Sequence, residues 1–168
     1  LNDNEKKEFY VAKVNNRLRE LTYELCYDCE VELLTLSDKD AVKVYETSLR
    51  YLLAMAMHNL YPNYTIRLSY NISRSLLISI LSPNEVRADN KMVKDLINEL
   101  NRLVKEDIPF IKFSSSKDEA HNYYVTHNEE DKDALLNFRP EKICHFYKCQ
   151  DYQNYMFGYM VPSTGYLK

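Results

Sequence analysis

The chain opens with short stretches in which hydrophobic and polar residues alternate. Residues 9–14 (FYVAKV) and 17–21 (RLREL) flank the pair Asn15-Asn16. Asparagine tolerates positive φ, so the pair predicts a tight β-hairpin between two strands. A third extended run follows at 30–36. The first 36 residues therefore predict a small β-rich piece that has too few strands to be a stable fold alone.

A long helix is predicted to begin at Ser37, which is placed to act as its N-cap, with Asp40 three residues further on as in a capping box. Hydrophobic residues then recur with a 3.6-residue period, and Pro62 ends the pattern. The predicted buried face consists of Ala41, Val44, Tyr45, Leu49, Leu52, Leu53, Ala56, Met57 and Leu60.

Two strands and a second helix are predicted next. Residues 64–70 and 76–81 read as strands joined by a short connection. In the stretch SPNE, Ser82 is placed as a helix cap and Pro83 as the first helical residue. The predicted apolar face of this helix holds Val86, Met92 or Val93, Leu96, Ile97, Leu100, Leu103 and Val104.

The last third of the chain predicts mixed short elements. An extended segment starts at Pro109, helices are expected at 117–126 and 130–138, and strands at 143–149 and 155–161. Strands and helices do not alternate as a doubly wound parallel sheet requires. The order indicates an α+β fold with an antiparallel sheet and long helices packed on it.

Composition and charge narrow the function classes. No apolar run approaches the roughly 18 residues that span a bilayer, and the polar start has no secretory signal, so we expect a cytoplasmic protein with no membrane partner. The 22 basic and 25 acidic residues give a net charge of −3. With no global positive field, Arg67, Arg74, Lys112 and Lys132 are expected to be scattered charges rather than a phosphate-binding rim.

The four cysteines raise the question of a zinc site. Cys26 and Cys29 form a C-x-x-C pair, but Cys144 and Cys149 lack that spacing. We therefore expect four separate reduced cysteines and no metal.

Three separated motifs and the leading β piece carry a resemblance to a known family. The segments 50–63 (RYLLAMAMHNLYPN), 131–136 (DKDALL) and 161–168 (VPSTGYLK) resemble the editing domain of threonyl-tRNA synthetases. Residues 10–36 resemble the C-terminal half of the small TGS domain that precedes it. The resemblance implies two domains, a TGS-like piece at 1–36 and an editing-like α+β domain at 37–168.

In that family the domain hydrolyses mischarged tRNA with an H-x-x-x-H pair on the long helix and a C-x-x-x-H pair before the VPSTG-like segment. Here the matching helix positions are Thr47 and Tyr51, and the second pair falls on Met156 and Met160. Hydrolysis of an aminoacyl ester needs a positioned base or a metal-bound water. The resemblance therefore implies a cleft without catalytic residues, in which Asn154 replaces an acidic residue and Lys132 is retained.

The remaining candidate cleft residues lie in VPSTG. Ser163 and Thr164 either cap free amides of a turn bracketed by Pro162 and Gly165, which we favour, or line the cleft beside Lys132. Gly158 is expected to permit a close backbone approach. The residues Met156, Met160, Tyr51, Tyr155 and Tyr159 are expected to fill a core, with an apolar pocket for a nucleobase or a partner as the alternative.

Residues 58–80 and 151–168 are also similar to the N-terminal region of uridine kinase-like nucleoside kinases. That resemblance implies a non-catalytic region whose P-loop kinase domain, with ATP and Mg²⁺, lies beyond Lys168; no G-x-x-x-x-G-K-[ST] motif occurs in the chain itself. The implied partners are the kinase domain, a nucleoside or nucleotide effector, or a second copy of the chain. The alternatives are an RNA- or tRNA-binding module derived from the editing domain, and a deacylase that uses a relocated histidine.

Overall fold

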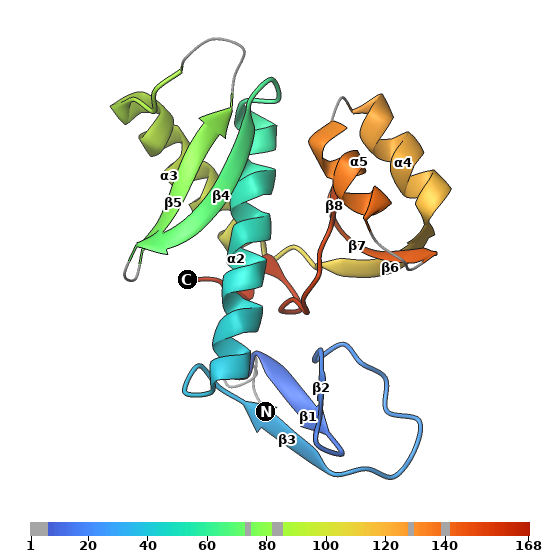
Figure 1. Ribbon diagram of the computed structural model, residues 1–168. Helices are drawn as coiled ribbons and strands as arrows, with labels where there is room; N and C mark the ends of the chain where they lie inside the picture. Colours follow the sequence, from blue (N-terminus) through green and yellow to red (C-terminus); the bar gives the residue numbers. More distant parts are fainter. Residues whose placement is uncertain (1–6, 73–74, 82–85, 128–129, 139–141) are drawn as a thin grey trace. The chain divides into compact units, whose positions relative to one another are not determined.

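The computed structural model describes residues 7–72, 75–81, 86–127, 130–138 and 142–168, and these divide into two compact units (Figure 1). The first unit contains the residues up to Phe110 together with Gly158–Lys168, and the second contains Ile111–Phe157. The α+β class is confirmed, with the described strands in three antiparallel sheets. The division into segments 1–36 and 37–168 stays a prediction, and the described part of the β-rich piece lies within the first unit.

The predicted N-terminal hairpin is confirmed. Strand β1 (Val11–Val14) pairs with β2 (Arg17–Arg19) and with β3 (Val31–Leu34), and both pairings are antiparallel. Asn15 and Asn16 have φ values of 47° and 61°, the left-handed pair that a two-residue type I′ turn requires.

The long helix α2 (Lys39–Leu60) contacts β1, β4 and α3, and it ends before Pro62 as predicted. Its predicted cap is wrong. Asp38 is the N-cap, and its side chain makes no cap bond. The Asp38 N–H donates to the Thr35 carbonyl in a turn that leaves Ser37 outside the helix. The buried face is also rotated from the predicted one, since Ser48 is fully buried while Leu49 is 41% exposed.

Strands β4 (Thr65–Ile72) and β5 (Ser75–Leu81) form the predicted antiparallel pair, and helix α3 (Asn90–Glu106) follows. The predicted helix start at 82–85 lies outside the described residues. Val86, which was expected on the helix, is not helical. The Asp89 side chain caps α3 instead by accepting from the Met92 N–H at 2.7 Å.

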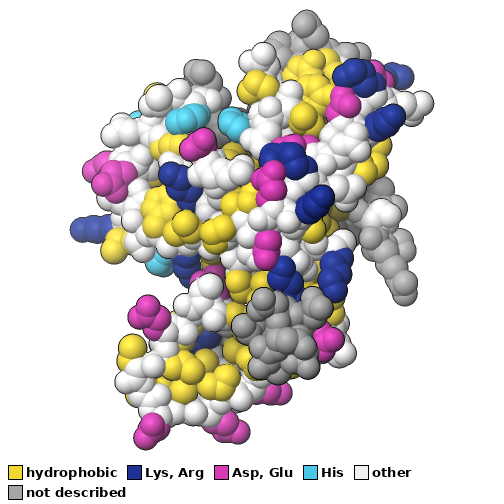
Figure 2. Space-filling view, turned by 180° about the vertical axis from the view of Figure 1, so that it is seen from behind, with side chains coloured by type: hydrophobic (Ala, Val, Ile, Leu, Met, Phe, Trp, Pro, Cys, Tyr) yellow, Lys and Arg dark blue, Asp and Glu magenta, His cyan; other side chains and the backbone are white. Residues whose placement is uncertain are grey.

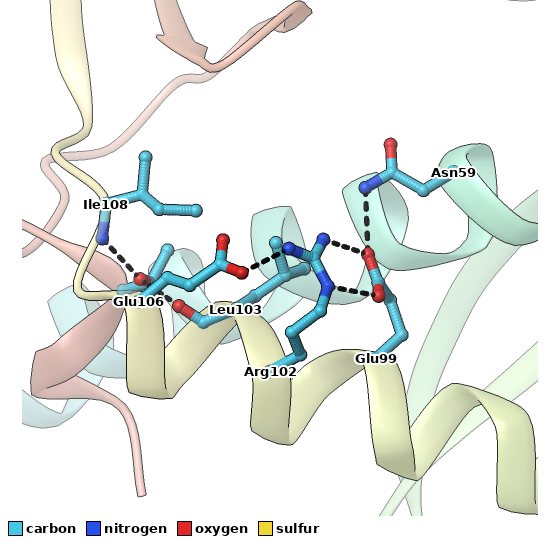
Figure 3. Close-up of polar contacts among 7 residues, drawn as sticks. Asn59, Glu99, Arg102, Leu103, Glu106 and Ile108 are labelled. Atoms are coloured by element: carbon cyan, nitrogen blue, oxygen red, sulfur yellow. Dashed lines mark hydrogen bonds and ion pairs between the residues drawn. The ribbon is translucent and has the colours of Figure 1, made fainter.

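Polar contacts join α3 to α2. Both oxygens of Glu99 accept from Arg102, and Glu99 Oε1 also accepts from Asn59 of α2 at 3.0 Å (Figure 3). Arg102 reaches Glu106 as well, at 2.6 Å. The Glu99 side chain is only 12% exposed, so this carboxylate is held by partners on two helices with little water around it.

The C-terminal segment 158–168 returns to the first unit. The predicted strand at 155–161 is wrong beyond Tyr155, and η1 (Thr164–Tyr166) is a single 3₁₀ turn that contacts α3. Buried Ser48 holds this segment on α2, since its hydroxyl donates to the Val44 carbonyl and accepts from the Val161 N–H at 2.9 Å. The largest fully buried side chains of this unit are Val11, Leu34, Tyr51, Leu52, Met55, Leu103, Met160, Val161 and Leu167.

The second unit is a three-stranded antiparallel sheet with two helices on it (Figure 1). Strands β6 (Ile111–Ser116), β7 (Ile143–Cys149) and β8 (Tyr152–Tyr155) lie in sequence order, and a left-handed Gln150 (φ 53°) sits in the β7–β8 turn. Helix α4 (Lys117–Thr126) follows β6 through a capping box between Ser116 and Glu119, and α5 (Glu130–Asn137) completes the pair. The core contains Ala120, Tyr124, Leu136, Cys144 and Phe146.

Candidate functional site

The eight predicted cleft residues are divided between the two compact units. Thr47, Tyr51, Met160, Ser163 and Thr164 belong to the first unit. Lys132, Asn154 and Met156 belong to the second. The two groups are therefore described separately.

Three positions of the first group show little capacity for hydrolytic chemistry. The Thr47 hydroxyl donates to the Lys43 carbonyl of its own helix at 2.8 Å. Tyr51 is 1% exposed, and its ring packs edge-on against Phe110 with centroids 5.4 Å apart. Met160 is 2% exposed and has no ionisable group. Because Tyr51 and Met160 are buried and the Thr47 hydroxyl bonds its own helix, none of these three side chains is placed to act on a substrate as a general base.

The Thr164 hydroxyl bonds backbone groups, and the Ser163 hydroxyl bonds the residue that caps the end of α3. Thr164 is fully buried; its Oγ1 accepts from the Ile108 N–H at 2.8 Å and donates to the Leu103 carbonyl at 2.5 Å. The Ser163 hydroxyl donates to Asp107 Oδ1 at 2.5 Å. The Thr164 hydroxyl therefore satisfies a backbone amide, but that amide belongs to the distant Ile108, and the Ser163 hydroxyl bonds a carboxylate rather than an amide. The turn itself is a 3₁₀ turn rather than the predicted type I or II turn.

Asp107, which sequence reasoning missed, organises this segment. It is the left-handed C-cap of α3 (φ 52°, ψ 49°), and it accepts from Ser163 and from the Gly165 N–H at 3.1 Å. Lys7 pairs with its other oxygen at 2.7 Å. Hydrogen bonds from Lys7 and Ser163 hold the pKa of Asp107 below its usual value, while partial burial opposes them.

The second unit brings Lys132 and Asn154 to one cluster of tyrosines. The Lys132 ammonium lies 5.7 Å from the ring centroid of Tyr124 and 5.8 Å from that of Tyr152. Asn154 Oδ1 accepts from the Tyr124 hydroxyl at 3.0 Å, and its amide donates to Tyr152 at 3.3 Å. Lys132 thus sits as a cation between two rings whose hydroxyls share Asn154. Met156, at the end of this unit, is half-buried.

The described basic residues that were considered for a phosphate-binding rim belong to both units. Arg67 is exposed on β4 of the first unit, Lys112 lies over the Tyr147 ring of the second, and Arg74 lies outside the described residues. Acidic and basic side chains are interspersed on the face seen in Figure 2. Within α3, neighbouring charges are paired, as in Lys91 with Asp95.

The cysteines also fall in different units. Cys26 is exposed and Cys29 half-buried in the loop before β3, whereas Cys144 and Cys149 are buried in β7. Within the residues that the structure describes, no group of three or more His, Cys, Asp or Glu side chains could hold a metal ion. Burial raises the pKa of the Cys149 thiol to about 11, which keeps it protonated at neutral pH.

His121, His127 and His145 each lie within hydrogen-bond distance of a partner. His121 Nδ1 lies 2.7 Å from Asp133, His127 Nδ1 lies 2.7 Å from the Tyr123 carbonyl, and His145 lies 3.3 Å from the Ser114 hydroxyl. None of the described helices is long and apolar enough to cross a membrane.

Comparison with curated proteins returns threonine–tRNA ligases. The Clostridium kluyveri ligase is 29% identical over 158 residues, which is 94% of this chain and 24% of the ligase. The ligase of Desulforamulus reducens is 30% identical over 163 residues, 96% of this chain and 25% of the ligase, and that of Carboxydothermus hydrogenoformans is 29% identical over 163 residues.

Over almost its whole length, this chain is similar to part of a threonine–tRNA ligase. It spans about a quarter of the length of these ligases. No family model matches the chain. The expected synthetase-like region is thereby confirmed, whereas the ligases give no support to the nucleoside kinase reading.

Proposed function

We propose that this chain is a tRNA-binding module that descends from a threonyl-tRNA synthetase editing domain and no longer hydrolyses aminoacyl-tRNA. The observation that carries the proposal is the similarity to threonine–tRNA ligases along 94–96% of the chain. The names of those relatives make tRNA the ligand class to test first.

The proposed loss of hydrolysis is supported by the side chains at the positions that match the editing motifs. A self-bonded Thr47 and a buried Tyr51 and Met160 provide neither a base with a suitable pKa nor a metal ligand set. Because the net charge of −3 supplies no general attraction to RNA, binding would depend on local cations such as Lys132, held between the rings of Tyr124 and Tyr152.

The direct test is fluorescence anisotropy with uncharged threonine-accepting tRNA at low and at moderate salt, together with a deacylation assay on mischarged tRNA. We expect binding that weakens with salt and ester loss at the buffer rate. A blunt-ended RNA hairpin serves as the control ligand. Absence of tRNA binding at low salt, or hydrolysis faster than in buffer, would contradict the proposal.

A second proposal is that the full-length protein is an ATP-dependent uridine or other nucleoside kinase, of which this chain is a regulatory, substrate-presenting or oligomerising region. It rests on the resemblance of residues 58–80 and 151–168 to such kinases, which the ligases found by comparison do not support. ATP and Mg²⁺ would bind outside this chain. Sequencing the gene beyond the codon for Lys168 separates the two proposals. A G-x-x-x-x-G-K-[ST] motif supports the kinase, and a synthetase catalytic core excludes it.

A further inference from the structure

Arg19 is a half-buried cation without a carboxylate partner in the described part of the chain. It lies on β2, and its Nη1 donates to the Leu18 carbonyl at 3.0 Å and to the Tyr159 hydroxyl at 3.4 Å. Its Nε is buried and, among the described residues, has no hydrogen-bond partner. Arg102 shows the contrast, because two carboxylates neutralise it.

A buried N–H without a hydrogen-bond partner is uncommon, and a ligand that supplies an acceptor would explain it. A guanidinium prefers planar, bidentate acceptors, and a phosphate group supplies two oxygens at the spacing of Nε and one terminal nitrogen. The ring that lies over the guanidinium belongs to Tyr23, with its centroid 5.1 Å from the guanidinium carbon. Tyr23 is 41% exposed, so the ring beside the guanidinium is reachable from solvent.

Exposed aromatic rings stand beside this cation. Tyr27 is 53% exposed in the same loop, and its hydrogen bond with Tyr23 raises its pKa. Solvent-exposed rings next to a guanidinium are the combination with which proteins hold nucleotides, with the base stacked on a ring and the phosphate on the cation.

We propose that Arg19, Tyr23, Tyr27 and Tyr159 form a nucleotide-binding site, in which Arg19 takes the phosphate and an exposed tyrosine stacks on the base. This site would be the place on the chain where tRNA is held. It rests on the tRNA-binding proposal for one of the two possible sources of its ligand. The nucleotide is either free in solution or the single-stranded 3′ end of a tRNA.

The test measures thermal shift and equilibrium binding of the full chain with adenosine and uridine monophosphates, the matching nucleosides, inorganic phosphate, and uncharged tRNA with and without its 3′-terminal nucleotides. We expect the monophosphates to stabilise the chain more than the nucleosides do. Arg19→Met should weaken the binding of phosphate-bearing ligands about tenfold or more, since tenfold is the worth of one of the two charge-assisted hydrogen bonds. Tyr23→Leu should weaken nucleosides and nucleotides alike.

The matched control is Arg17→Met, which removes the same charge from an exposed position of the same strand. Unchanged binding by Arg19→Met, or an equal loss in Arg17→Met, would overturn the site. If Arg19→Met fails to fold, Tyr23→Leu at its exposed position decides the matter, and unchanged binding there overturns the site as well.

The outcomes separate this site from the proposed function. If tRNA binds and Arg19→Met leaves its affinity unchanged, the site is wrong while the tRNA-binding proposal stands. If monophosphates bind through Arg19 and tRNA does not bind at all, the site stands and the tRNA-binding proposal fails. A tRNA lacking its 3′-terminal nucleotides should lose the contribution of Arg19 if the 3′ end is the source of the ligand.

Discussion

The carboxylate of Asp107 occupies the space that a β-carbon on Gly165 would need. Gly165 has an ordinary negative φ, so the requirement for glycine comes from this close approach and not from backbone conformation. The Gly165 N–H donates to the same carboxylate at 3.1 Å. The C-cap of α3 therefore holds the C-terminal turn through a contact that only glycine permits.

Gly165→Ala should destabilise the chain by about 1–3 kcal/mol, because the added methyl collides with Asp107. The matched control is Gly158→Ala, whose methyl would lie 3.4 Å from the Thr47 hydroxyl, at ordinary contact distance. We expect that variant to change the free energy of unfolding by less than about 1 kcal/mol. Urea denaturation of both variants measures the difference, and equal effects would refute the steric account.

The stabilising effect of Asp107 should disappear in acid. The folded state lowers the pKa of Asp107, so its contribution is present above the unfolded value of about 4 and is lost as the pH falls through the folded pKa. Asp107→Asn keeps a side chain that tolerates the left-handed conformation. We expect wild type to be more stable than this variant near neutral pH, and the gap to narrow as the pH falls below about 4 toward the lower folded pKa. A gap that does not narrow at all between pH 7 and pH 3 would show that charge is not its source.

Thr164→Val should cost about 1–3 kcal/mol, since it leaves the buried Ile108 N–H and Leu103 carbonyl without their partner. Thr164→Ser keeps the hydroxyl and should lose less. Thermal and urea unfolding, measured beside the tRNA assay, give the readout. If Thr164→Val kept full stability and instead reduced ligand binding, the cleft alternative for this hydroxyl would be favoured.

Glu99→Gln should destabilise more than Glu106→Gln, although both residues bind Arg102. The Glu99 side chain is 12% exposed and also accepts from Asn59, whereas that of Glu106 is 42% exposed. We expect about 1–2 kcal/mol for Glu99→Gln and under about 1 kcal/mol for Glu106→Gln. Added salt should diminish the Glu106 effect further. The reverse order in urea denaturation would contradict this account.

Local signals predicted the parts of the fold that local interactions determine. The Asn15-Asn16 turn needs only two residues that accept positive φ, and Pro62 stops a helix wherever it lies. The helix starts were predicted less well, because several residues in a row are able to cap. For α2 the pattern predicts Ser37 as the cap, whereas Asp38 is the cap. For α3 it predicts a start before Val86, whereas Asp89 is the cap.

The arrangement around Thr164 was beyond sequence reasoning because its partners are distant in the chain. Thr164 bonds residues 56 and 61 positions away, and Asp107 meets Gly165 across 58 positions. The strand predicted at 155–161 follows an apolar run, yet the pairing of β8 with β7 ends at Tyr155. Hydrophobicity alone does not say whether such a run bonds to a neighbouring strand or buries itself in a core.

The four cysteines should react with a thiol reagent in an order set by burial. Cys26 is exposed and should be modified first at pH 8, followed by half-buried Cys29. Cys144 and Cys149 are 3% and 1% exposed, and the Cys149 pKa of about 11 further suppresses its thiolate. Both should react only after denaturant is added. Cys26→Ser should abolish the fast phase seen with Ellman's reagent, while Cys149→Ser should leave it intact and reduce the signal that appears on unfolding. A fast phase that survives in Cys26→Ser would mean that half-buried Cys29, or a thiol of an opened β7, reacts as fast as the exposed thiol, and it would contradict an order set by burial.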